Sequence, residues 1–115
     1  MLQSDWMAME KTKRTTAALA HVATYVLPFL AVTRSPGALA FIVGTHFVID
    51  RWRLARYVCW VKNWLAPPGW NKSWSDCSAT GYTADKPAWM AVWLLIITDN
   101  AMHLICNAVA LRAWP

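Results

Sequence analysis

Three apolar stretches dominate this chain of 115 residues and limit what it can fold into. The stretches are Thr15–Val32, Gly37–Ile49 and Ala88–Leu111, and the spans predicted from them cover about residues 15–33, 37–53 and 88–111. An α-helix crosses the hydrocarbon core of a bilayer in about 20 residues, with a range of about 17–25. The second stretch reaches that length only if its helix continues to Arg53, with the arginine side chains extending to the lipid headgroups. The sequence therefore predicts an all-α integral membrane bundle with three transmembrane helices.

The composition agrees with a membrane protein. Hydrophobic residues make up 57% of the chain and charged residues 15%, whereas soluble domains carry about 25% charged residues. Disorder requires low hydrophobicity, so this chain is not disordered. The nine tryptophans suit a membrane interface, where the ring can be dry and its edge wet. We expect a single membrane domain, residues 1–115, with the lipid bilayer rather than nucleic acid as the partner of its +5 net charge.

The basic residues predict an orientation. Nine of the eleven lysines and arginines lie before the first span or between the end of the second apolar stretch at Ile49 and the third span, and the other two are Arg34 and Arg112. Cytoplasmic segments carry the excess of basic residues. We therefore expect a multi-pass protein of the bacterial inner membrane, with the N-terminus and the long loop in the cytoplasm and the C-terminus outside.

Residues 54–65 are too polar for a fourth span. Their apolar residues recur at helical spacing and are interrupted by charges, which is typical of an amphipathic helix at the membrane interface, with Trp60 and Trp64 as anchors. Pro67 and Pro68 end this helix, and a cytoplasmic loop of residues 66–87 follows. Two interpretations of the loop stay open. Its aromatic residues lie on the membrane surface, or the loop is a lid over a substrate.

Ionisable residues inside the predicted spans are the strongest functional signal. A charged residue at the bilayer centre costs roughly 2.5–3.5 kcal/mol on the insertion scale. Five such groups occur, in two pairs four residues apart on their helices together with a single histidine, and they are His21, His46, Asp50, Asp99 and His103. Helical rise places the first four in one layer near the cytoplasmic boundary, and His103 about one turn deeper.

Imidazole and carboxylate groups in one layer suit a divalent metal such as Zn²⁺, Mn²⁺ or Fe²⁺. All five groups are candidate ligands, and His46, Asp50, Asp99 and His103 are also candidate catalytic residues. The competing interpretation is that these polar residues only hold the helices of a small bundle together. Nearby, Arg51, Arg53 and Arg56 are candidates for contact with an anionic headgroup or phosphate.

Four segments carry a resemblance to a known family: LQSDWMAMEKTK, ALAHVATYVLPF, FIVGTHFVIDRWRLARYVCWVKN and DNAMHLICN. In order and spacing they resemble domain-of-unknown-function family 3307, which comprises small bacterial and phage membrane proteins. The resemblance implies a helical membrane protein with recurring His and Asp, here His21, His46, Asp50, Asp99 and His103. It implies no activity. A looser similarity exists to predicted membrane-bound metal-dependent hydrolases.

One departure from the family concerns the N-terminus. Its members usually open with a further apolar helix that carries His-x-x-x-Asp just before the LQ segment. Met1 directly precedes Leu2 in this sequence, so we expect the helix to be missing. Without that pair of ligands, a metal site is either incomplete or completed by another subunit.

Two functional hypotheses follow. The first is a membrane-embedded metal-dependent hydrolase that acts on a lipid or a lipid-linked phosphate. The second is a non-enzymatic homo-oligomer, phage-encoded, that excludes other phage, counters a defence or permeabilises the membrane.

Overall fold

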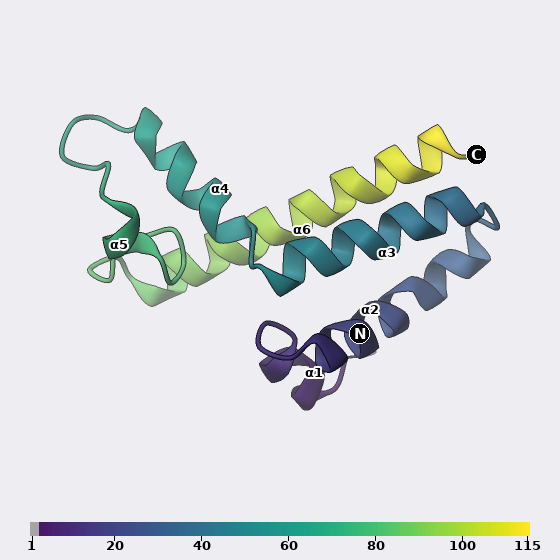
Figure 1. The fold of residues 1–115 in the computed structure, drawn as a ribbon. Coiled ribbons are helices and arrows are strands. Elements are labelled where there is room, and N and C mark those ends of the chain that lie inside the picture. Colours follow the sequence, from purple (N-terminus) through teal and green to yellow (C-terminus); the bar gives the residue numbers. More distant parts are fainter. Residues whose placement is uncertain (1–2) are drawn as a thin grey trace. The chain divides into compact units, whose positions relative to one another are not determined.

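The computed structural model describes residues 3–115, and over that range it contains helices and no strands (Figure 1). The predicted all-α class is confirmed. The chain packs as two compact units. The first comprises the chain up to Arg53 together with His103–Pro115, and the second is Leu54–Met102. We describe each unit by itself.

The first unit begins with a short helix that lies outside the predicted elements. Helix α1 covers Asp5–Glu10, and the Ser4 hydroxyl accepts a hydrogen bond of 3.3 Å from the Met7 amide at its start. An N-terminal cap of this kind satisfies an amide that has no partner within the helix. The cap therefore gives the polar N-terminal segment a defined helical end.

The first two predicted spans are helical but shorter than expected. Helix α2, Thr15–Val26, continues as a 3-10 helix, η1, over Leu27–Ala31. The change comes at Pro28, which has no amide hydrogen for the α-helical pattern. Helix α3 covers Pro36–Arg51 and ends before residue 53, because Arg53 adopts a left-handed φ of 51°.

A small apolar core joins these helices to the end of α6. Ala38 and Ile42 of α3 are buried against Ala110, and Tyr25 and Phe29 pack around them. Helix α6 covers Ala88–Ala113, and its C-terminal part (yellow in Figure 1) runs beside α3. Alanine at two of the three core positions lets the helix backbones approach closely.

The second unit contains the predicted interfacial helix and a folded loop. Helix α4, Ala55–Lys62, and the 3-10 helix η2, Asn63–Leu65, agree with the predicted helix over residues 54–65. Within residues 66–87 the short helix α5 covers Trp74–Cys77. The Trp60 indole donates to the Lys72 carbonyl at 2.9 Å, and the Tyr57 and Trp74 rings stack with centroids 4.5 Å apart. The segment is thus packed on α4.

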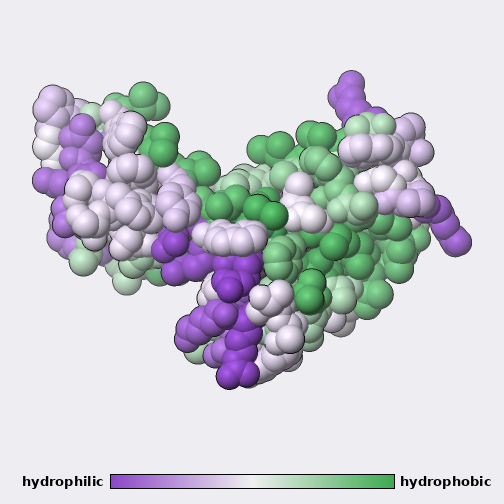
Figure 2. Space-filling view, in the orientation of Figure 1, coloured by the Kyte–Doolittle hydropathy of each residue, from purple (hydrophilic) through white to green (hydrophobic). Residues whose placement is uncertain are grey.

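One helix in the described part of the chain is long and apolar enough to cross a membrane. Helix α6 has 26 residues, and only 17% of its most apolar 18-residue stretch is buried within the protein. Large apolar side chains such as Ile97, Leu104 and Ile105 are exposed along it. Apolar surface also covers much of the visible face formed by α3 and the end of α6 (Figure 2). The 16 residues of α3 span about 24 Å, against a hydrocarbon core of about 30 Å.

Candidate metal centre

Three helices of the first unit bring imidazole groups to one carboxylate. His46 and Asp50 lie one turn apart on α3, so their side chains share a face. Helix α2 contributes His21, and the C-terminal part of α6 contributes His103. All four residues are buried, with 4–7% of their surface exposed.

The distances show that Asp50 is the centre of the cluster. Its Oδ2 lies 2.9 Å from Nε2 of His21 and 3.3 Å from Nε2 of His46. Its Oδ1 lies 3.1 Å from Nε2 of His103. His103 therefore contacts Asp50 directly, whereas helical rise along the sequence predicts it about a turn deeper. All three imidazole rings present the same nitrogen to one carboxylate.

A lysine that is absent from the predicted site completes the cluster. Lys11, just after α1, places its Nζ 2.8 Å from Oδ2 of Asp50. Arg51 holds the linker that carries Lys11, because its guanidinium donates to the backbone carbonyls of Thr12 and Lys13. Only 22% of the Lys11 side chain and 3% of the Asp50 side chain are exposed, so this is a largely buried ion pair.

The contact between His21 and His46 restricts which of their ring nitrogens can carry a proton. Nε2 of His21 and Nε2 of His46 are 3.0 Å apart. At that distance one nitrogen has to accept, or both have to present lone pairs to a shared cation. Nδ1 of each of these two rings is buried, and no described residue offers it a hydrogen-bond partner. Each ring therefore keeps one nitrogen, on the side away from Asp50, without a partner among the described residues.

Tyr25 and Asn107 fix the orientation of the rings. The Tyr25 ring stacks on His46 with centroids 3.6 Å apart, and its hydroxyl accepts a hydrogen bond of 2.6 Å from the Asn107 side-chain amide. Asn107 lies four residues after His103 on α6 and hence on the same face of that helix. Tyr25 is not among the predicted site residues, although it lies four residues after His21 and hence on the same face of α2.

The spacing of the ligand atoms fits a metal ion. His21, His46 and Asp50 each offer an atom, and these atoms lie within 4.8 Å of one another. Ligand atoms about 2.0–2.1 Å from a tetrahedral zinc ion would lie about 3.3 Å apart. The three separations of 2.9, 3.0 and 3.3 Å are close to that spacing. A buried group that could hold a metal ion is therefore present.

A cavity adjoins this cluster within the first unit. Its volume is about 430 Å³, and His21 forms part of its wall. Tyr25, Phe29 and Leu104 make the wall largely apolar, while Gln3 presents a buried Oε1 that has no partner among the described residues. An apolar molecule with a polar head could therefore approach His21.

Asp99 and three arginines are the remaining predicted site residues. Asp99 is half-buried on α6, one turn before His103, and belongs to the second unit, so its assignment to the centre stays a prediction. Arg51 binds the backbone of the linker before α2. In the second unit, Arg56 donates to the Ser78 carbonyl at 2.9 Å. Headgroup contact by Arg51, Arg53 and Arg56 also stays a prediction.

Comparison of the chain with family models, curated proteins and solved structures returns no match.

Proposed function

We propose that the protein is a membrane-embedded, metal-dependent hydrolase of the bacterial inner membrane, as a member of domain-of-unknown-function family 3307. Its substrate is a lipid or a lipid-linked phosphate. The observation that carries the proposal is the convergence of three histidine nitrogens on one buried carboxylate, at 2.9, 3.1 and 3.3 Å. Ionisable groups are costly in a bilayer, and a cluster of them is by default a functional site.

In this proposal His21, His46 and Asp50 hold a divalent ion. Zn²⁺ suits two imidazoles and a carboxylate best, with Mn²⁺ and Fe²⁺ as alternatives. When bound, such an ion makes water acidic enough to supply a nucleophile near neutral pH. Hydrolysis adds the water oxygen to the substrate and breaks the bond to the leaving oxygen. His103 would serve as the general base that accepts the proton of the water and as the general acid that returns it to the leaving oxygen.

The cavity beside His21 supports a lipid substrate. Its wall is mostly apolar, it reaches the cluster, and its volume of about 430 Å³ lies within the usual range for small-molecule sites, about 300–1,000 Å³. Helix α6, α3 and the continuous segment of α2 with η1 form three spans in this proposal. The N-terminus and residues 66–87 are then cytoplasmic, and acyl chains enter the cavity from the bilayer.

Elemental analysis of detergent-purified full-length protein tests the proposal. We expect near-stoichiometric zinc, manganese or iron in the wild type, and its loss in Asp50→Asn and His46→Gln. Asp85→Asn serves as the matched control, because its carboxylate lies in the second unit and its side chain is 73% exposed. Folded wild-type protein that contains no metal, after purification without chelator, would contradict the proposal.

A second candidate function is a non-enzymatic homo-oligomer that alters or protects a host membrane. The observation that favours it is the Lys11–Asp50 ion pair of 2.8 Å, which already compensates the buried carboxylate without any ion. In that case the histidines hold the helices together or line a contact between copies. Metal-free, folded protein of defined subunit number, with leakage activity in liposomes, is the result expected for this candidate.

A further inference from the structure

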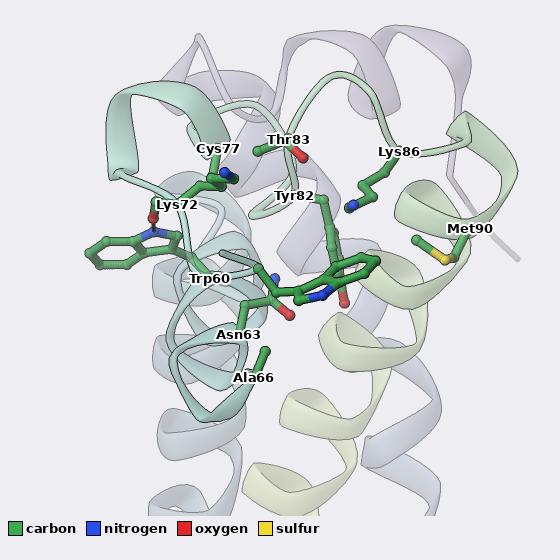
Figure 3. A pocket seen from close by; sticks show the side chains of 10 residues that line it. Trp60, Asn63, Ala66, Lys72, Cys77, Tyr82, Thr83, Lys86 and Met90 are labelled. Atoms are coloured by element: carbon green, nitrogen blue, oxygen red, sulfur yellow. Dashed lines mark hydrogen bonds between the residues drawn. The ribbon is translucent and has the colours of Figure 1, made fainter. Parts of the chain in front are cut away.

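A second cavity, separate from the candidate metal centre, lies within the second unit (Figure 3). Its volume is about 150 Å³, enough for a few water molecules or one small group. Residues from α4, η2, the 66–87 segment and the first turn of α6 line it. The residues on which the following argument depends are Trp60, Trp70, Tyr82 and Lys86.

Tyr82 presents an unused hydrogen-bond donor to this cavity. Only 7% of the residue is exposed, and its hydroxyl lies near Lys62 and Cys59 but makes no hydrogen bond of normal geometry to a described residue. Burial raises the pKa of the Tyr82 phenol above its ordinary value, so the hydroxyl keeps its proton. Buried polar groups nearly always have a partner, and a bound acceptor would supply one here.

Lys86 adds a positive charge to the same wall. Its side chain is 25% exposed, and its Nζ lies 4.2 Å from the centre of the Trp70 ring. Figure 3 shows Lys86 and Tyr82 among the side chains that line the cavity. The acid that pairs with Lys86, Asp85, is 3.6 Å away and 73% exposed, so solvent weakens that pair.

The aromatic rings by themselves would suit a cation, but lysines already take those positions. The Lys86 ammonium is over Trp70, and Lys62 Nζ lies 5.2 Å from the centre of the Tyr82 ring. A bound cation would be repelled by both ammonium groups. A ligand with negative oxygens would instead accept from Tyr82 and pair with Lys86.

We infer that this cavity is a binding site for a phosphate monoester group, either free in solution or as the headgroup of an anionic lipid. The phosphate oxygens accept hydrogen bonds from the Tyr82 hydroxyl and the Lys86 ammonium, and the indole of Trp60 closes the side of the site. The Trp60 indole nitrogen is fixed by the Lys72 carbonyl at 2.9 Å, so this wall is formed before any ligand binds. The inference does not depend on the metal centre.

Calorimetric titration of the detergent-solubilised full chain tests this inference. The probes are inorganic phosphate and dihexanoyl phosphatidic acid, with dihexanoyl phosphatidylcholine as the lipid that lacks a monoester. We expect one phosphate or phosphatidate per chain. Loss of a charge-assisted hydrogen bond weakens binding roughly tenfold or more, so Lys86→Met should bind at least that much more weakly. Tyr82→Phe should bind severalfold more weakly.

Two variants serve as controls. Tyr57→Phe removes a phenol hydroxyl outside the cavity, and Lys13→Met removes a lysine of the first unit, so both should bind like the wild type. Tyr82→Phe should melt at the same temperature as the wild type or higher, because the hydroxyl makes no hydrogen bond of normal geometry to a described residue.

The probes separate the two sources. Binding of inorganic phosphate indicates a soluble ligand, and binding of phosphatidate alone indicates a lipid headgroup. The inference is overturned if the folded protein binds neither probe. It is equally overturned if Lys86→Met and Tyr82→Phe bind as tightly as the wild type.

Discussion

The buried charge of Asp50 depends on its neighbours for stabilisation. A carboxylate whose side chain is only 3% exposed has lost most of its hydration, and only hydrogen bonds and opposite charges can replace it. Lys11, His21, His46 and His103 surround its two oxygens. Folding of this unit and the chemistry of the cluster therefore depend on the same few atoms.

Substitution of Lys11 separates a metal centre from a purely structural cluster. Removing one partner of a buried ion pair costs about 3–5 kcal/mol. In protein from which metal has been removed with a chelator, Lys11→Met should therefore have a free energy of unfolding lower by about that amount. A divalent ion beside Asp50 would replace the lost positive charge. We expect added zinc to raise the melting temperature of Lys11→Met back toward that of the wild type.

Thermal melts in detergent, with and without zinc, provide this measurement. Lys13→Met is the matched control, because Lys13 is exposed and should change stability little. A loss of stability that zinc does not reverse would favour the structural cluster. No loss at all would contradict the importance of the Lys11–Asp50 pair.

The sequence pattern predicts the histidines and Asp50 of this site but not its lysine. Residues four apart on a helix share a face, and this rule alone pairs His46 with Asp50. Lys11 reaches Asp50 from a different segment, and a basic residue before a predicted span is normally interpreted as a topology signal. That contact depends on how the α1–α2 linker folds, which helical periodicity does not describe.

At the scale of the elements, residues 66–87 are the segment whose packing the sequence does not predict. The helix over 54–65 could be predicted because its apolar residues recur at helical spacing. The packing of the following segment could not, because it rests on single contacts such as Trp60 to Lys72 and Arg56 to Ser78. Such contacts leave no periodic signal in the sequence.

Gly81 tests the packing of this segment on α4. Its φ is +84°, and a Cβ there would lie 2.3 Å from the Arg56 carbonyl oxygen. A left-handed conformation costs an L-residue about 1–2 kcal/mol, and the backbone clash adds to this. We expect Gly81→Ala to lower the free energy of unfolding by more than about 2 kcal/mol and to make residues 66–87 sensitive to protease.

Gly69→Ala is the control for this variant. Gly69 has a similar φ of +92°, but no described atom lies within 4 Å of the position that a Cβ would take. Only the conformational cost of about 1–2 kcal/mol therefore applies. Equal effects of the two substitutions would show that Gly81 is not held against α4.

At the scale of the whole molecule, α6 decides how the protein meets a membrane. It is the helix with the length, composition and exposed apolar surface for a span. We expect the protein to stay in the membrane fraction after extraction at alkaline pH and to be released only by detergent. The double substitution Ile97→Asp with Ile105→Asp should abolish this behaviour, since each charge at mid-span costs roughly 2.5–3.5 kcal/mol.

Fractionation followed by immunoblotting measures the effect, and Asp85→Asn, outside the predicted spans, is the control. Release of the wild type at alkaline pH would contradict a transmembrane α6. The same preparation gives the subunit number by light scattering, which bears on the proposed homo-oligomer.

The order of the chain has a consequence for the synthesis of this protein. His103 belongs to the first unit, but the whole of Leu54–Met102 lies between it and Arg53. A ribosome therefore delivers all of the second unit before the last donor to Asp50 emerges. Domains tend to fold as their residues appear, so the second unit can fold while the first still waits. During that interval Asp50 has the donors from Lys11, α2 and α3 but still lacks the His103 imidazole from α6.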